Sequence, residues 1–126
     1  MYERIYYRSK RIKKKEEKYL SWKIHDIFIA KLKNGETIIR KVKGNSMTPL
    51  IKSGDSLTIT YVNLNEIQKG DVVYCKVGGY IYCHLVTGIK TESCNLRFKI
   101  SNNHGHDNGW TSTIYGKVME VNGSKI

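Results

Sequence analysis

The stretch Gly44–Asp55, Gly-Asn-Ser-Met-Thr-Pro-Leu-Ile-Lys-Ser-Gly-Asp, carries the strongest signal in the sequence. It places Ser46 before a Met-x-Pro and ends on a Gly-Asp turn. Two segments follow downstream: Gly70–Tyr74, which reads Gly-Asp-Val-Val-Tyr, and His84 inside an apolar run. A serine hydroxyl becomes a nucleophile when a neighbouring base accepts its proton, and an imidazole that titrates near neutrality suits that task. Ser46 and His84 are of the residue types that such a nucleophile and base require.

Together these segments resemble the signal-peptidase and SOS-repressor superfamily of serine peptidases, whose nucleophile lies in a Ser-Met-x-Pro segment. The run Tyr80–Val86 is similar to the branch that uses histidine as the base, found in archaeal and endoplasmic-reticulum signal peptidases, although Leu85 stands where Arg is common. The resemblance covers roughly residues 41–121. It implies a coiled β-sheet, or partly closed barrel, with Ser46 at one edge and the Ser46 N–H helping to hold the oxyanion.

The same resemblance suggests a third catalytic residue. Relatives carry Lys-Gly-Asp-Asn-Asn before a later Asp, and one of these acids orients the base. Here Ser101 replaces the first acid, whereas Asp107 matches the second. We expect Asp107 to bond the imidazole of His84, because an acceptor at that position fixes the tautomer and stabilises the imidazolium. Asn102 and Asn103 are weaker substitutes.

The pattern of apolar residues and turns predicts an all-β fold from Lys23 onward. Apolar residues at even positions between Ile24 and Leu32 lead to Asn34-Gly35, a dipeptide typical of two-residue hairpins. A second hairpin is expected at Gly78-Gly79. Further strands are predicted at Ser56–Val62, Asp71–Val77, Tyr80–Ile89, Leu96–Ser101 and Tyr115–Val121. Short strands at regular spacing, with a single proline in the chain, favour this class.

The chain of 126 residues is expected to form one domain, residues 23–126, preceded by a basic N-terminal arm at residues 1–22. The sequence has 22 basic and 11 acidic side chains. A charge of this size favours contact with nucleic acid, an anionic surface or an acidic protein, although a solvated tail fits equally well. The candidate nucleic-acid contacts are Arg4, Arg8, Lys10, Arg11, Lys13, Lys14, Lys15 and Lys18.

The sequence lacks the segments that would direct the protein to a membrane or out of the cell. No span reaches the ~18–20 apolar residues of a membrane helix, and the basic start has no secretory pattern, so we expect a cytoplasmic protein. The three cysteines are an odd number and are expected to stay reduced. His84, His104 and His106 could offer three nitrogens to a metal. Histidines in a polar, glycine-rich loop more often bind nothing, so neither metal nor cofactor is expected.

Three functions are compatible with these features. The first is a small serine endopeptidase that cleaves a partner protein, or its own chain, after small residues. The second is a catalytically lapsed member of the fold that binds nucleic acid or an acidic protein through its basic surface. Ser101 in place of an acid, and Gly44 where some relatives have a hydroxyl, favour this alternative. The third is a phage or mobile-element accessory factor that uses the fold for protein–protein contact.

Overall fold

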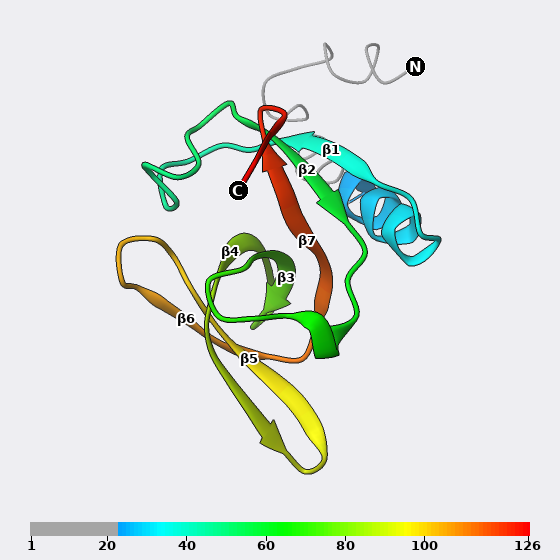
Figure 1. Cartoon of the computed structure of the whole chain (residues 1–126), viewed down its shortest axis with the longest axis vertical. Coiled ribbons are helices and arrows are strands. Elements are labelled where there is room, and N and C mark those ends of the chain that lie inside the picture. The colour runs from blue at the N-terminus through cyan, green and yellow to red at the C-terminus, as the bar shows by residue number, and fades with distance from the viewer. Residues whose placement is uncertain (1–22) are drawn as a thin grey trace, which may run out of the picture.

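The computed structural model describes residues 23–126, which form a single antiparallel sheet with one helix beside it (Figure 1). The strand order is β1-β2-β7-β3-β4-β5-β6, with β8 paired to β7. The sheet is strongly bent but does not close into a barrel. The all-β prediction is therefore confirmed, and the sheet is of the open kind. The strands are β1 (Ile38–Lys41), β2 (Ser56–Thr60), β3 (Val72–Val77), β4 (Tyr80–Glu92), β5 (Asn95–Ser101), β6 (Asp107–Thr111), β7 (Ile114–Val121) and β8 (Ser124–Lys125).

The five strands predicted from Ser56 onward are confirmed, with small changes of their ends. Gly78-Gly79 joins β3 to β4 as a two-residue hairpin, and both glycines have positive φ. Strand β6 had not been predicted, because its Asp-Asn-Gly start is typical of a turn. Within residues 41–121 the only helical segment is the 3₁₀ turn at Leu64–Glu66.

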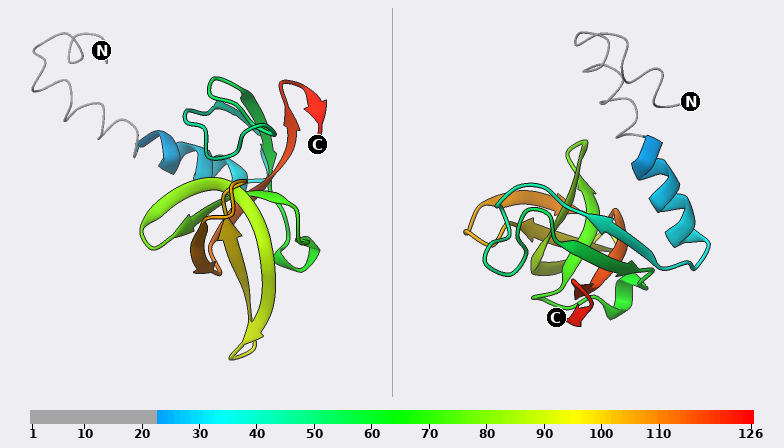
Figure 2. Two further views of the ribbon diagram at one scale, coloured as in Figure 1. Left: turned by 90° about the vertical axis from the view of Figure 1, so that its left-hand side faces the viewer. Right: turned by 90° about the horizontal axis from the view of Figure 1, so that it is seen from above.

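The prediction of a strand directly after Lys23 is wrong, because residues 23–33 are helical. His25, Phe28, Ile29 and Leu32 follow the i, i+3, i+4, i+7 spacing of one helix face, and these side chains are the more buried ones in the segment. Phe28 and Ile29 pack against the core that contains Leu32. The helix lies along one side of the sheet (Figure 2).

The turn at Asn34-Gly35 ends this helix and does not form a hairpin, so that prediction is also wrong. Gly35 has φ +82°, its N–H donates to the Leu32 carbonyl at 3.0 Å, and the Glu36 N–H donates to the Lys31 carbonyl at 3.0 Å. This pair of bonds is a Schellman cap. Asn-Gly tolerates positive φ in both settings, so the dipeptide alone does not distinguish a hairpin from a helix end.

Two apolar clusters form the core. The first lies between the helix and the sheet and includes Leu32, Leu57 and Tyr74, together with Met47 and Ile51 from the segment that follows β1. Met47 and Ile51 are 4% and 3% exposed. Burying such side chains contributes about 1.5–3 kcal/mol each, which anchors the segment that carries Ser46. The second cluster is built from Ile67, Val73, Cys75, Val77, Val86, Phe98 and Ile100.

In the described part of the chain, no helix has the length and apolar character needed to cross a membrane.

Candidate active site

Ser46, in the segment between β1 and β2, meets His84 of β4, a strand inside the sheet. The Ser46 Oγ lies 3.0 Å from the His84 Nε2, although the residues are 38 positions apart in the sequence. His84 is 7% exposed and sits in β4, opposite Val73 of the central strand β3. Ser46 projects from the segment between β1 and β2, next to the buried Met47. The structure thus brings the two predicted residues to hydrogen-bond distance.

The other ring nitrogen of His84 contacts Asn108, not Asp107. The His84 Nδ1 lies 2.7 Å from the Asn108 Oδ1. Because an amide oxygen can only accept, Nδ1 carries the hydrogen and Nε2 presents its lone pair to the Ser46 hydroxyl. This is the tautomer that a general base for Ser46 requires.

The prediction that Asp107 bonds His84 is therefore wrong. A β-bulge places Asn108 beside the imidazole instead. Ile100 pairs with Gly109, whereas Ser101 pairs with Asp107, so Asn108 is an extra residue in β6. A bulge turns a side chain out of the regular ladder, as often happens beside active sites. The sequence match was one residue away from the imidazole's partner, and no pattern in the sequence marks this bulge.

Asp107 does not contact His84 but bonds residues of the strand beside it. Its carboxylate accepts a hydrogen bond from the Ser101 Oγ at 2.7 Å and pairs with the Lys99 Nζ at 3.1 Å. The Ser101 Oγ in turn accepts from the Thr87 Oγ1 at 2.7 Å, which ties β4, β5 and β6 together next to His84. The bond from Ser101 and then that from Lys99 lower the pKa of Asp107, so this carboxyl stays ionised.

His84 has a neutral imidazole at neutral pH. Burial lowers the pKa of His84 below its usual value of about 6.5, and the charge of His106 adds to this, whereas the bond to Asn108 opposes it. The ring of Tyr82 lies beside the imidazole, with 4.8 Å between the ring centroids. A neutral imidazole with a free Nε2 lone pair can accept a proton from Ser46.

A second loop holds the segment that carries Ser46. The Asn103 N–H donates to the Ser46 carbonyl at 2.9 Å, and the Asn103 Nδ2 donates to the Thr48 carbonyl at 3.1 Å. The His104 Nε2 lies 3.0 Å from the Asn45 carbonyl, so it carries a hydrogen and donates. The loop between β5 and β6 therefore grips the main chain on both sides of the candidate nucleophile. The sequence offered no signal for this role.

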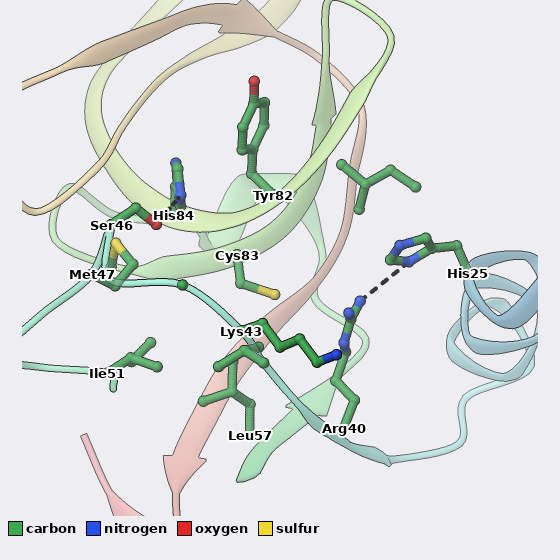
Figure 3. A pocket seen from close by; sticks show the side chains of 13 residues that line it. His25, Arg40, Lys43, Ser46, Met47, Ile51, Leu57, Tyr82, Cys83 and His84 are labelled. Atoms are coloured by element: carbon green, nitrogen blue, oxygen red, sulfur yellow. Dashed lines mark hydrogen bonds between the residues drawn. The ribbon is translucent and has the colours of Figure 1, made fainter. Parts of the chain in front are cut away.

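A cavity of about 330 Å³ opens beside the Ser46–His84 pair (Figure 3). Its apolar wall comes from Val42, Met47, Ile51, Leu57 and Ile81. At the other end of the cavity lie His25, Arg40 and Lys43, three basic side chains from the helix and from the chain at and after β1. The cavity thus joins a candidate nucleophile to a basic region, and sequence reasoning had not linked the two.

Two further possibilities raised by the sequence are a metal site and a nucleic-acid interface. Within residues 23–126 no three His, Cys, Asp or Glu side chains are placed to hold a metal ion. The proposed nucleic-acid contacts, Arg4 through Lys18, and the predicted arm at residues 1–22 lie outside the described residues. Cys75 and Cys83 are free thiols whose pKa values are raised by burial.

Comparison with known families supports the resemblance found in the sequence. The sequence model of the family described as Peptidase S24-like matches residues 7–119. The match begins inside the stretch that was predicted as a separate basic arm and includes Ser46, His84 and Asn108. No curated protein matches the chain in a sequence search.

Proposed function

The chain belongs to the Peptidase S24-like family, and from this premise we propose that it is a serine peptidase with Ser46 as nucleophile and His84 as general base. The observation that carries the proposal is the 3.0 Å contact between the Ser46 Oγ and the His84 Nε2. The use of histidine as the base would assign the chain to the histidine branch of the superfamily.

In the first step, the His84 Nε2 accepts the Ser46 proton while Oγ forms a bond to the scissile carbonyl carbon. The carbonyl π electrons move to oxygen, and in this proposal the Ser46 N–H donates a hydrogen bond to the oxyanion. The imidazolium then gives its proton to the leaving amine as the C–N bond breaks. Water, deprotonated by His84, hydrolyses the acyl-enzyme and restores Ser46.

Asn108 acts through His84 and is a positioning residue. By accepting from Nδ1–H at 2.7 Å, it keeps Nε2 unprotonated and directed at Ser46. A neutral amide stabilises the imidazolium less than a carboxylate would, and Cys-His-Asn peptidases show that such a partner suffices for catalysis. The Ser101–Asp107 pair holds the neighbouring strands in place.

The substrate is a peptide segment, in another protein or in this chain, that enters the cavity in extended form with small residues next to the scissile bond. Gly44 and Asn45 give the approach to Ser46 little side-chain bulk, and Gly44 has φ +101° with no atom near a Cβ built on it. The absence of a hydroxyl at residue 44 leaves main-chain N–H groups as oxyanion donors.

A fluorophosphonate probe, which phosphonylates activated serines with loss of fluoride, tests this proposal. Wild-type protein should be labelled, whereas Ser46→Ala and His84→Gln should not. Ser112→Ala is the matched control, because Ser112 is exposed and bonds the Leu96 carbonyl in the turn after β6. Equal labelling of wild type and Ser46→Ala, or no labelling of folded wild type, contradicts the proposal.

A further inference from the structure

The end of the cavity away from Ser46 is formed by His25, Arg40 and Lys43; we call it the basic end, and its Arg40 is held by neighbouring side chains. The Arg40 guanidinium lies over the rings of Phe28 and Tyr74, at 5.7 and 5.4 Å from their centroids. Its Nη1 donates to the His25 Nδ1 at 3.2 Å. Arg40 is half-buried, so its position is set by packing as well as by charge. Figure 3 shows Arg40 and Lys43 reaching into the same region between His25 and Leu57.

Among residues 23–126, no carboxylate forms an ion pair with the basic end, and Asp26 acts on His25 only through its charge. The Arg40 Nε is buried and has no hydrogen-bond partner there. His25 adds no negative charge, and its Nδ1 must accept, since Arg40 can only donate. A half-buried guanidinium with one unpaired buried N–H is stabilised when a ligand supplies the acceptor and the counter-charge.

The geometry points to a carboxylate as that ligand. The planar guanidinium pairs with a carboxylate through two parallel N–H donors, and a cavity wall of Leu57 and Ile81 strengthens the pair by excluding water. Within this proposed peptidase, we propose that the basic end is a subsite for an acidic side chain, Asp or Glu, of the substrate. The enzyme then selects peptides by a small residue at the scissile bond and an acidic residue within a few positions of it.

Binding to the Ser46→Ala protein tests the subsite without requiring catalysis. The probes are acetylated, C-terminally amidated Ala/Gly hexapeptides with Glu at one position, each paired with its Gln analogue. Hydrogen bonds to charged groups predict at least about tenfold tighter binding of one Glu peptide, because they are worth roughly 1.5–3 kcal/mol. Amide NMR shifts at residues 40–44 and 81–84 should follow the binding. Equal affinity of every Glu/Gln pair overturns the proposal. If the same peptides bind more tightly only when their C-terminus is left unamidated, the basic end binds a terminal carboxylate, and the side-chain subsite is overturned.

Charge-changing variants locate the effect. Lys43 is exposed, so Lys43→Glu should fold and should reverse the preference from Glu peptides to Lys peptides. Arg40→Gln should abolish the Glu preference, and Arg40→Lys, which keeps the charge but not the fork, should weaken it. Lys41→Gln is the control, because Lys41 is exposed on the same strand but does not line the cavity. If folded Lys43→Glu and Arg40→Lys keep the full preference, the subsite is elsewhere. Fluorophosphonate labelling of the wild-type protein distinguishes the two failures: absence of labelling contradicts the peptidase, whereas labelling without any Glu preference contradicts the subsite alone.

Discussion

Each end of the cavity contains a histidine, buried His84 or half-buried His25, whose pKa is lowered chiefly by burial, yet the two imidazoles make different hydrogen bonds. At one end, His84 donates from Nδ1 to Asn108 and points its Nε2 at a serine hydroxyl. At the other end, the His25 Nδ1 lies 2.6 Å from the Tyr74 hydroxyl and also accepts from Arg40. The difference shows that burial alone does not make a histidine a base.

What separates the two histidines is the group that would lose a proton. Burial, the largest cause, raises the pKa of Tyr74 to about 12, so its hydroxyl stays protonated and acts as a fixed donor. Tyr74 is also fully buried and out of reach of a substrate. Ser46, by contrast, lines the cavity. We therefore expect proton transfer at His84 and a structural role at His25.

Replacing each histidine in turn should give the largest contrast. His84→Gln should reduce kcat/KM, or the rate of acylation, by about 10⁴-fold, because general base catalysis is worth up to that factor. His25→Gln should change it by less than about tenfold, since His25 touches no reacting atom. The measurement is the rate of acylation of both variants, taken from samples quenched at successive times. A comparable loss in both would remove the distinction between the two ends.

The tautomer of His84 can be disturbed without removing the base. Asn108→Ala should lower kcat by about 10²-fold or more, because Nδ1–H loses the acceptor that keeps Nε2 free. Asp107→Asn, the adjacent residue, should have a smaller effect, since Asp107 contacts Ser101 and Lys99 and not the imidazole. The two variants are compared by kcat at fixed pH. A larger loss in Asp107→Asn would show that the bulge register differs in the working enzyme.

The pH dependence of the rate should report His84 alone. Burial, the largest cause, lowers the pKa of His84 below 6.5, so activity should stay level as the pH falls to about 6.5 and decline only further down, tenfold per unit. In Asn108→Asp a carboxylate beside the imidazole should raise the pKa of His84, so that the decline in activity begins about 1–3 pH units higher. The His25→Gln variant should keep the wild-type profile. A midpoint above 7 in wild type would contradict the burial of His84.

The pH dependence of stability should report both histidines. Burial lowers the folded-state pKa of both histidines. The charge of Arg40 lowers the pKa of His25 further, and the charge of Asp26 opposes this shift. Just below pH 6.5 the unfolded chain therefore binds more protons than the folded chain. The free energy of unfolding should fall as the pH drops from about 6.5 through the folded-state pKa values. Urea titrations should show a smaller fall in His25→Gln and in His84→Gln than in wild type.

The smallest effect is expected at the hydroxyl of Tyr74. Tyr74→Phe keeps the ring between His25 and Tyr115 but removes the bond to the His25 Nδ1. Loss of one such bond should lower the free energy of unfolding by about 0.5–1.5 kcal/mol and leave acylation of Ser46 unchanged. Urea unfolding with an unchanged m-value checks the first part. A large loss of acylation would place Tyr74 in the proton pathway.

The Ser46–His84 contact could be predicted from sequence because the short segments around both residues resemble those of a known peptidase superfamily. Ser-Met-x-Pro fixes a turn, Met47 anchors it, and His84 lies in a strand whose register follows from the Gly78-Gly79 hairpin. The partner of Nδ1 could not be predicted in the same way. It depends on a bulge in β6, where one extra residue decides whether position 107 or 108 faces the imidazole.

The basic end was missed for another reason. Its members meet only if residues 23–33 are helical, and an alternating interpretation of Ile24, Phe28 and Leu32 predicted a strand. The four-residue spacing of these side chains, followed by Asn34-Gly35 as a cap, is equally visible in the sequence. The contact between Arg40 and His25 follows from that helix and not from any motif.

The loop between β5 and β6 is hydrogen-bonded to the segment around Ser46, and these bonds have an evolutionary consequence. Asn103 and His104 bind the main-chain carbonyls of residues 45, 46 and 48, so the hold does not depend on the side chain at position 46. A lineage can therefore gain, lose or exchange its nucleophile by a single codon change without rebuilding the architecture around it. Families built in this way are expected to contain active enzymes and inactive binders side by side, separated by one residue.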